Sequence, residues 1–520
     1  MAASKTEAVG HTSGRARWCL AGMMTGFVAI FVISGAAASP LVTPLPWGAR
    51  PPGWTRVLAD ALGLSGTGRT ALSIASWLIV AVVVGLFVVL LREAKRGRVR
   101  TATAVAASLT SLVLATAAPM LLSRDVLSYA AYGRISAIYG SNPYLVLPAS
   151  FARDPFVRVT SAQWLHTRSL YGPAFTLVSS WIVRTWPDSP GAVILAFKVI
   201  VGSAVGLAVL LTARSVRSIR PGRASLAVLL VGMNPVIVIH TVGGGHIDGL
   251  LTGMLAGGLA LAIAASRAER RATRSLLAAA VTALLTLACL TKITVVPILV
   301  LWIWWLCRAT IGGKGRRAAL HLSIVAALSA ALFTPFLAGW RTLTPVATLG
   351  GIETWASPAA MVANASRHLT DAIAGHGAGD VVHAAVEAAF IAVAVLLLVR
   401  LGRVASRGTS GLAEAAAFGW GPALLLLALS LPFLLPWYAA WFVPFLALIG
   451  DDVLMWMGVV ASGVLALTLI PADPALGYTS WEVMSFVHFA AAPIMSLLLV
   501  VVWRRTARIT AEPVLPSSAR

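Results

Sequence analysis

The sequence predicts an all-α protein that crosses a membrane about 14 times, with about 12 to 15 helices as the expected range. Three observations support this fold class. Hydrophobic residues make up 58% of the 520 residues and charged residues only 11%, with a mean hydropathy of +0.87, whereas a water-soluble domain carries about 25% charged residues. Apolar runs of roughly 20 residues, the length that spans a bilayer, recur along almost the whole chain. Arginine and lysine gather in the short loops between these runs, as in the cytoplasmic loops of membrane proteins.

The net charge of +22 does not indicate a nucleic-acid partner. The basic residues are confined to those short loops, where they set the topology and attract anionic membrane lipid. The three cysteines, Cys19, Cys289 and Cys307, lie far apart inside apolar runs. Their spacing predicts neither a disulfide framework nor a metal site.

Counting charges along the chain places the first large loop outside the cell. Residues 1–17 are expected to form a disordered cytoplasmic segment, followed by a retained helix over 18–39 with no signal-peptide cleavage site. A proline-rich outer loop leads to a helix over 71–91, which ends in a run of basic residues. The third helix returns outward and ends near Leu122, so the loop 123–170 is extracytoplasmic.

The later basic turns continue the alternation and place both termini in the cytoplasm. Residues 18–503 are expected to form one transmembrane domain, and 504–520 a cytoplasmic tail. Two apolar stretches, 171–186 and 191–213, lie between this outer loop and the next basic, cytoplasmic turn. Only an odd number of crossings can join the two sides, so 171–186 is predicted to be a short or re-entrant helix. The further outward-facing segments are expected at 243–248, around Lys292, at 339–382, at 431–438 and at 471–482.

The apolar run Leu276–Trp305 is too long for one crossing. Thr291, Lys292 and Pro297 interrupt it, so it is predicted to form a helical hairpin with its bend near the outer surface. Lysine at such a depth is costly without an anionic partner, which suggests a functional position. The alternative is that Lys292 extends to the lipid headgroups for structural reasons.

Asp125 is the first candidate for catalysis. It lies where an apolar helix gives way to the outer loop, in a chain with only 18 acidic residues. A carboxylate at the membrane surface is a candidate proton acceptor for a lipid-borne substrate. The alternative is a helix-end ion pair with Arg124. The residues that follow, Val126 to Ile135, have the spacing of a helix lying along the membrane interface.

The second outward segment contains Gly243-Gly244-Gly245-His246-Ile247-Asp248. Three glycines allow a tight bend and a close approach of backbone amides to a ligand. His246 and Asp248 follow at the start of the next helix, where the helix dipole favours an anion. Three alternatives remain: helix capping by Asp248, metal ligation by the His-x-Asp pair, and a purely structural role for the nearby His240.

The last outward cluster, Pro436-Trp437-Tyr438-Ala439-Ala440-Trp441, is aromatic. Its three large rings are either ligand-binding residues or members of the aromatic belt found at membrane interfaces.

These segments carry a family resemblance. The stretch Asp125 to Arg134, then Asn142-Pro143-Tyr144 and Tyr171-Gly172-Pro173, resembles the first extracytoplasmic loop of GT-C glycosyltransferases. The block from Asn234-Pro235 to Asp248 is similar to that of actinobacterial polyprenol-phosphate-mannose-dependent α-(1→6) mannosyltransferases of lipomannan assembly. Two departures are visible: Ile247 stands where Asn is expected, and the first loop has a single acid at its start.

The resemblance implies an inverting enzyme in the cell membrane with an extracytoplasmic active site. Its donor is polyprenyl-phosphate-mannose and its acceptor a lipid-linked mannan, with no cofactor and no metal ion. Asp125 is the implied general base. The implied ligands of the donor phosphate are Lys292, His246, Arg134 and His240. The implied substrate-binding residues are Arg124, Tyr129, Asn142, Tyr144, Tyr171, Gly244, Gly245, Asp248, Trp437, Tyr438 and Trp441; among them, Tyr129, Tyr144, Trp437 and Trp441 are expected to stack on sugar rings of the acceptor.

Two alternatives stay open at this point. A related enzyme that uses another lipid-phosphate sugar, such as an arabinofuranosyl donor, satisfies the same residues. A glycolipid flippase would explain the interrupted hairpin, but it is expected to repeat that feature in its other half.

Overall fold

The computed structural model describes residues 11–42, 53–308, 314–347, 353–354, 356–375, 377–408, 411–470 and 486–511. The regular elements in these ranges are helices, and the only β-type pairing among them is an isolated bridge between Ala338 and Trp340. The expected all-α membrane fold is therefore confirmed for the described part of the chain. The outer turn expected at 471–482 lies outside the described residues.

Nine described helices are long and apolar enough to cross a bilayer. They are α1 (Gly14–Ser34), α3 (Arg69–Lys95), α8 (Pro190–Ile219), α10 (Asp248–Arg267), α11 (Arg271–Cys289), α13 (Lys314–Phe333), α16 (Ala378–Gly408), α17 (Leu412–Ser430) and α21 (Ala492–Ala511). The helix α1 begins at Gly14 and α21 continues to Ala511, so both extend into the segments that were expected to be tails.

A tenth crossing is bent. The helix α9 (Ala224–Gly232) and the π-helical turn Val236–Val242 meet at an angle of 41°. Pro235 lies in the break, where its missing N–H interrupts the helical hydrogen bonds. The Asn234 side chain accepts a hydrogen bond from the Val236 amide and donates one to Ser462.

Four shorter apolar stretches complete the bundle in the described ranges. They are α4 (Thr101–Ala117), α12 (Val296–Arg308) with the 3-10 turn before it, the broken stretch Pro436–Leu448 that contains α18 (Ala439–Phe442), and α19 (Asp452–Ala466). With these four counted as spans, the described helices give the expected number of about 14 crossings.

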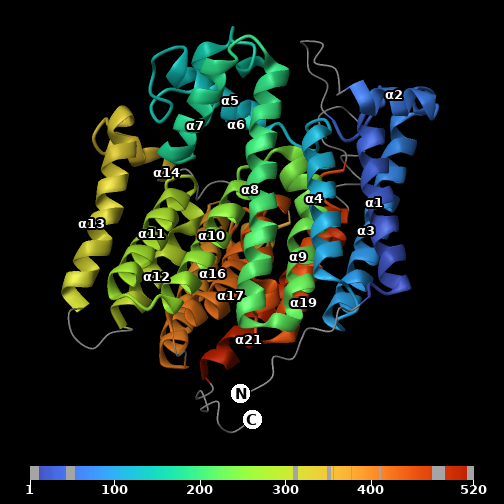
Figure 1. Ribbon diagram of the computed structural model, residues 1–520. Helices are drawn as coiled ribbons and strands as arrows, with labels where there is room; N and C mark the ends of the chain where they lie inside the picture. Colours follow the sequence, from blue (N-terminus) through green and yellow to red (C-terminus); the bar gives the residue numbers. More distant parts are fainter. Residues whose placement is uncertain are drawn as a thin grey trace.

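The ends of the bundle differ in character. At one end lie α2 (Gly53–Ala61), α5 (Asp125–Ala137), α6 (Ala162–Leu165) and α7 (Pro173–Thr185) (Figure 1). The start of α1 and the last turns of α21 are at the other end, where Ser13 bonds to Arg98 and Arg505 pairs with Asp451. The 13-residue α7 packs against α5 at that end instead of crossing the bundle, as expected for the short helix at 171–186.

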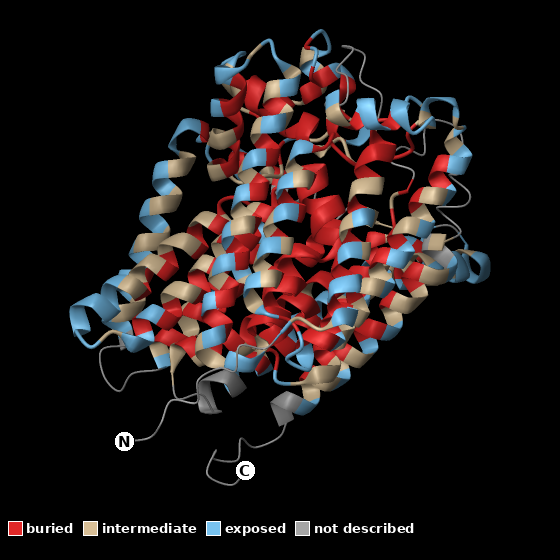
Figure 2. Cartoon of the chain, turned by 45° about the vertical axis from the view of Figure 1, so that its right-hand side comes forward, coloured by how far each residue is buried: buried red, intermediate tan, exposed pale blue. Residues whose placement is uncertain are grey.

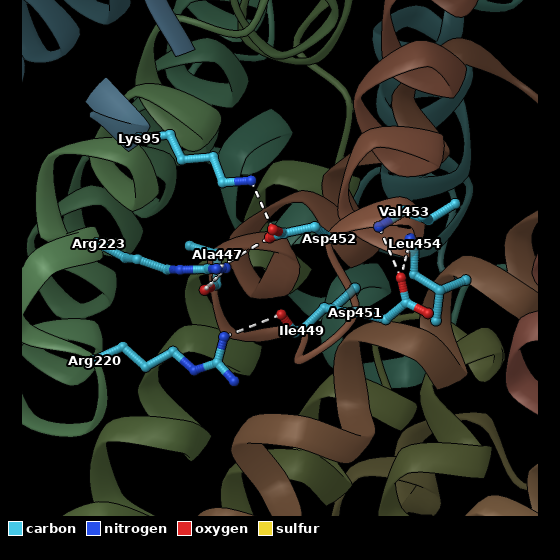
Figure 3. A network of polar contacts seen from close by, with 9 residues as sticks. All are labelled: Lys95, Arg220, Arg223, Ala447, Ile449, Asp451, Asp452, Val453 and Leu454. Atoms are coloured by element: carbon cyan, nitrogen blue, oxygen red, sulfur yellow. Dashed lines mark hydrogen bonds and ion pairs between the residues drawn. The ribbon is translucent and has the colours of Figure 1, made fainter. Parts of the chain in front are cut away.

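Basic residues from distant segments converge on the other end (Figure 3). Asp452, the first residue of α19, pairs with Lys95 of α3 at 2.6 Å and with Arg223 at 3.0 Å. Arg220 donates to the Ile449 carbonyl at 3.2 Å. Asp451 caps α19 and pairs with Arg505 at 3.4 Å. Basic turns separated by hundreds of residues thus share one end, as the charge alternation predicts.

Burial is highest in the middle of the bundle (Figure 2). The helix α17 and the stretch 436–448 are buried along almost their whole length. In α13 and α16, by contrast, only 11% and 17% of the membrane window is buried, so their apolar side chains face outward. Outward apolar surface of this extent is characteristic of helices in contact with lipid.

The interfacial helix predicted after Asp125 is α5, at the end of the bundle where α2, α6 and α7 lie (Figure 1). The helix forms, but every residue from Val126 to Ile135 is buried. Its outer side is covered by α7 and by the 3-10 turns of the long loop, which the spacing of its own residues could not reveal.

Candidate active site

The start of α5 is held in place by the segment that links it to α4. The amide of Leu121 donates to the carbonyl of Gly243 at 3.0 Å, which joins this segment to the glycine block. Lys198 of α8, which is 1% exposed, donates to the carbonyls of Ala118 and Pro119, the latter at 2.9 Å. Carbonyl oxygens thus satisfy a buried lysine, and the lysine fixes the turn that leads into α5.

The three glycines pack directly beneath this turn. A Cβ atom on Gly243 would lie 2.9 Å from a Leu121 side-chain carbon, and one on Gly244 would lie 2.8 Å from the His246 ring. Gly245 has a φ of +72°, and its Cβ would meet Val126 at 2.8 Å. Only glycine fits these positions without displacement of α5 or His246. Gly244 and Gly245 therefore shape the site through their backbone.

The bend brings His246 to Asp125. The Nδ1 atom of His246 lies 3.3 Å from Oδ2 of Asp125, although the two are not aligned for a hydrogen bond. The imidazole is 1% exposed and stacks on Trp437, with ring centroids 3.4 Å apart and an interplanar angle of 13°. The Asp125 side chain is 13% exposed. The stacked Trp437 ring thus holds the His246 imidazole next to the partly exposed Asp125 carboxylate.

A second pair lies two residues further along the chain. Oδ1 of Asp248 accepts hydrogen bonds from Lys292 Nζ at 2.8 Å and from Trp441 Nε1 at 2.6 Å. The Lys292 ammonium lies 4.4 Å from the Tyr438 ring centroid and 5.3 Å from that of Trp441. Asp248 is fully buried, whereas Lys292 keeps 14% of its side chain exposed. The costly lysine at the bend of the α11–α12 hairpin therefore has an anionic partner.

The two pairs belong to one cluster, because His246 and Asp248 are two residues apart and their partners Trp437 and Trp441 lie in the same aromatic segment. Burial raises the pKa of the Tyr129 phenol well above its usual range, and the negative charges of Asp125 and Asp248 both raise it further. Burial likewise raises the pKa of Tyr132, with a contribution from Asp125. Both phenols therefore stay protonated, and they can donate hydrogen bonds beside the carboxylates but cannot serve as bases.

The capping alternative for Asp248 is resolved by these contacts. Ile247, not Asp248, occupies the N-cap of α10, and the Asp248 side chain binds Lys292 and Trp441. His246 has other partners, Asp125 and Trp437. Because its carboxylate is bound by Lys292 and Trp441, capping does not describe the role of Asp248.

Lys292 is positioned by the start of α7. The Gly172 amide donates to the Thr291 carbonyl at 3.0 Å, and the Ala174 amide to the Leu290 carbonyl at 3.0 Å. A Cβ atom on Gly172 would lie 2.0 Å from the Leu290 oxygen. Gly172 therefore allows the first outer loop to reach the hairpin bend. The adjacent Tyr171 makes edge contacts with Tyr129 at 5.0 Å and supplies its carbonyl to the Tyr144 hydroxyl.

An apolar groove of about 420 Å³ begins beside this bend. Its walls come from α7, α11, α12, α13 and the turns after α13. Several lining side chains are open to the outside of the bundle: Ile293 is 40% exposed, Val300 56% and Leu322 55%. Leu290 and Ile293 flank Lys292, so the groove joins a lipid-facing surface to the polar cluster.

Three expected phosphate or substrate ligands have other partners in the structure. Arg134 is buried and pairs with Asp154 at 2.6 Å and with the Pro187 carbonyl at 2.7 Å. His240 is buried in the π-helical turn, with Nε2 3.0 Å from the Ala466 carbonyl. The Asn142 side chain donates a hydrogen bond to the Phe336 carbonyl and accepts one from the Tyr144 backbone amide. These contacts correct the expectation for Arg134, since its charge is neutralised inside the loop, and they give His240 and Asn142 structural roles.

The aromatic residues are more enclosed than expected. Tyr129, Tyr144, Trp437 and Trp441 are 1%, 4%, 5% and 1% exposed. They do not form a lipid-facing belt, and none has an open ring face for a sugar. Trp437 supports His246 and Trp441 supports Asp248, while Tyr438 stacks on Trp441 at 4.0 Å. Arg124 directly precedes α5 and so remains at the entrance to the cluster.

Two residues of the site were not anticipated from the sequence. Lys198 is a lysine within a 30-residue apolar helix, and that placement alone was a signal. Asp154, the partner of Arg134, also accepts hydrogen bonds from the Tyr139 hydroxyl and the Phe156 amide. It lies in an irregular loop without periodicity, and nothing local to it indicated this role.

Comparisons with known proteins point to one family. Residues 23–308 match the family described as α-(1→6)-mannopyranosyltransferase, N-terminal domain. The chain is 32% identical over 209 residues to α-(1→6)-mannopyranosyltransferase A of Corynebacterium glutamicum, an alignment that covers 37% of this chain and 41% of that protein. It is 34% identical over 137 residues to a probable α-(1→6)-mannopyranosyltransferase of Mycolicibacterium smegmatis, covering 26% and 24% of the two chains.

A third relative, an α-(1→6)-mannopyranosyltransferase of Mycobacterium tuberculosis, is 32% identical over 137 residues, which cover 26% of this chain and 23% of that protein. The similarity thus spans about a quarter to two fifths of the length of these relatives. No solved structure shows significant similarity. The family match covers more than half of the chain and includes Asp125, the glycine block and Lys292. On this evidence the chain belongs to the α-(1→6)-mannopyranosyltransferase family.

Proposed function

We propose that this chain is an inverting glycosyltransferase that moves mannose from polyprenyl-phosphate-mannose to a lipid-linked mannan, with formation of an α-(1→6) linkage on the extracytoplasmic side of the membrane. The observation that carries the proposal is the combination of three features: a partly exposed carboxylate at Asp125 beside His246, a lysine at Lys292 paired with Asp248 of the same His-x-Asp block, and an apolar groove lined by Leu290 and Ile293 near that lysine in the chain. The family of the chain supports the choice of sugar and linkage.

Asp125 is the proposed general base. Its carboxylate takes the proton of the acceptor hydroxyl, the hydroxyl oxygen attacks the anomeric carbon, and the bond from that carbon to the phosphate oxygen breaks. The electron pair stays on the polyprenyl phosphate, which leaves. His246 lies beside the carboxylate and Trp437 fixes its plane, so the direction of Asp125 is set before the substrate binds.

Lys292 is the proposed anchor for the phosphate. Its ammonium has three N–H donors, and in the described structure one of them is used by Asp248. A cation fixed in this way stabilises the charge that grows on the phosphate as the glycosidic bond breaks. Asp248 is a positioning residue in this scheme, since its buried carboxylate holds the ammonium in place.

The apolar groove is the proposed place of the polyprenyl chain. Its volume of about 420 Å³ lies within the range of about 300–1,000 Å³ of ordinary ligand pockets. Exposed Val300 and Leu322 open it toward lipid, so the donor can enter sideways from the bilayer with its phosphate toward Lys292. The end that carries Asp125 lies opposite the basic turns around α19 (Figure 1), which favours an extracytoplasmic site by the charge rule.

The test uses the purified full chain in proteoliposomes with labelled lipid-linked mannose and a mannan acceptor. Asp125→Asn should lower transfer by about 10²–10⁴-fold, the contribution of a general base. Asp188→Asn is the matched control, because Asp188 is exposed in the turn between α7 and α8 at the same end. Transfer that survives Asp125→Asn undiminished excludes Asp125 as the base.

The same preparation tests the identity of the reaction. Preferential transfer from labelled lipid-linked arabinofuranose would replace mannose in the proposal. Movement of a glycolipid between leaflets without any sugar transfer would indicate a flippase and would refute the enzymatic proposal as a whole.

A further inference from the structure

Three metal-ligating side chains converge away from the cluster of Asp125 and Lys292. Glu353 lies in the segment before α15 (Pro358–Ala374), and His383 and Glu387 lie on α16. One ligand atom of each lies within 4.8 Å of the others. His383 and Glu387 are four residues apart and therefore occupy the same face of the helix.

These groups are poorly satisfied by the protein alone. The Nε2 atom of His383 lies 3.1 Å from Oε1 of Glu353. In the described ranges, that Nε2 and Oε1 of Glu387 are both buried without a hydrogen-bond partner. Among the described residues, no ion pair involves Glu387, and the only ion pair of Glu353 is with His383. Two carboxylates so close together repel each other unless a positive charge lies between them.

A neighbouring residue orients the cluster. Asn364 of α15 donates to the other oxygen of Glu353, Oε2, at 2.6 Å and to the Ala360 carbonyl at 2.9 Å. Oε1 of Glu353 is thereby turned toward His383. A ligating carboxylate held by an outer hydrogen bond is the usual arrangement around protein-bound metal ions.

We propose that Glu353, His383 and Glu387 bind one divalent cation of the first transition row, with Zn²⁺ or Mn²⁺ as the fitting ions. Two carboxylates and a neutral imidazole balance a charge of +2. An imidazole nitrogen favours such metals over Ca²⁺ and Mg²⁺, which prefer oxygen ligands. Neighbouring ligands of a tetrahedral zinc site lie about 3.3 Å apart, as follows from metal–ligand distances of about 2.0 Å, and the His383–Glu353 distance is 3.1 Å.

The cation would tie this loop to the segment that leads into the aromatic cluster. Thr354, next to Glu353, donates from its amide to the Pro432 carbonyl at 3.1 Å and from Oγ1 to the Leu434 carbonyl at 2.8 Å. The Leu434 amide donates back to the same hydroxyl at 2.7 Å. The chain then continues to Trp437, which stacks on His246. A bound cation therefore orders a support of the site without contact with substrate.

The test measures metal binding by the full-length protein in detergent, without any sugar donor. After removal of metal with a chelator, Zn²⁺ and Mn²⁺ are titrated separately, and the bound metal is quantified by elemental analysis. We expect one equivalent for the wild type. His383→Ala and Glu387→Gln should weaken binding by about 100-fold or more, and Asn364→Ala by about 10–100-fold as an outer-shell change.

Matched controls are His368→Ala, an exposed histidine on the neighbouring α15, and Glu269→Gln, an exposed acid in a basic turn; both should retain binding. Hydrogen exchange of residues 431–434 should slow by at least severalfold on addition of Zn²⁺ to the wild type but not to His383→Ala. Binding of Mg²⁺ alone, absence of stoichiometric binding, or binding that survives both ligand variants would overturn the proposal. These outcomes do not depend on whether the chain transfers mannose.

Discussion

The pair formed by Asp248 and Lys292 supports a quantitative prediction. At the 2.8 Å between Lys292 Nζ and Asp248 Oδ1, two unit charges attract by about 6 kcal/mol at an effective dielectric constant of about 20. Much of this attraction offsets the loss of water around both groups. Breaking a buried pair by removal of one partner costs about 3–5 kcal/mol, because the remaining charge stays buried. For Lys292→Met we expect the lower end, about 3 kcal/mol, since Trp441 still donates to Asp248.

The double variant Lys292→Met/Asp248→Asn separates stability from catalysis. It removes the orphaned charge and should regain most of the free energy of unfolding, while transfer stays at least about 100-fold below the wild type because the phosphate has lost its cation. Thermal unfolding in detergent and transfer in proteoliposomes measure the two effects. Lys95→Met is the control, because its partly exposed pair with Asp452 is worth about 1 kcal/mol or less. A double variant as unstable as the single one, or with restored transfer, refutes the reasoning.

Three further predictions concern the supports of the site. Gly172→Ala should lower the free energy of unfolding by about 1–3 kcal/mol and raise the KM for donor, because the added Cβ meets the Leu290 carbonyl. The control Gly191→Ala adds a Cβ in open space and should change neither quantity. Equal behaviour of the two variants would contradict the packing argument. Arg134→Met should destabilise the protein by about 3–5 kcal/mol, measured by thermal unfolding, with an unchanged KM for donor in the folded fraction; a selective loss of donor affinity would restore the phosphate role. Trp437→Leu should lower kcat by about fivefold, as expected for loss of a stacking contact of about 1 kcal/mol, with Trp437→Phe less affected; identical rates in both variants would show that the stack does not orient His246.

Much of the architecture follows from patterns that are local in the sequence. Apolar run lengths predict the helices, and the basic turns predict which of their ends lie together, as the meeting of Lys95, Arg220 and Arg505 with their partners at one end confirms. The interruption at Thr291 and Lys292 predicts the hairpin. Each of these features depends only on residues within one helix length of each other.

The parts that could not be predicted depend on residues far apart in sequence. Lys292 needs an anion, but nothing within its own segment identifies Asp248, 44 residues earlier, as that anion. The spacing of apolar residues predicts the helix α5, but it does not show that α7 covers it. The family resemblance implies Arg134 as a phosphate ligand, whereas Asp154, 20 residues later, pairs with it inside the loop. Tertiary partners decide these roles, and composition does not encode them.

The weak burial of α13 has a consequence for how the enzyme depends on its surroundings. Near its first turns, His321 is hydrogen bonded to Thr282 of α11 at 2.7 Å, and past its far end the Phe336 carbonyl accepts from Asn142 at 2.8 Å. Between these two points α13 packs on α11 and α12 with one side only, and its other side faces away from the bundle. For the proposed lateral entry of the donor, bilayer thickness and lateral pressure would then act on the width of the groove, and we expect the rate of transfer to change with lipid composition.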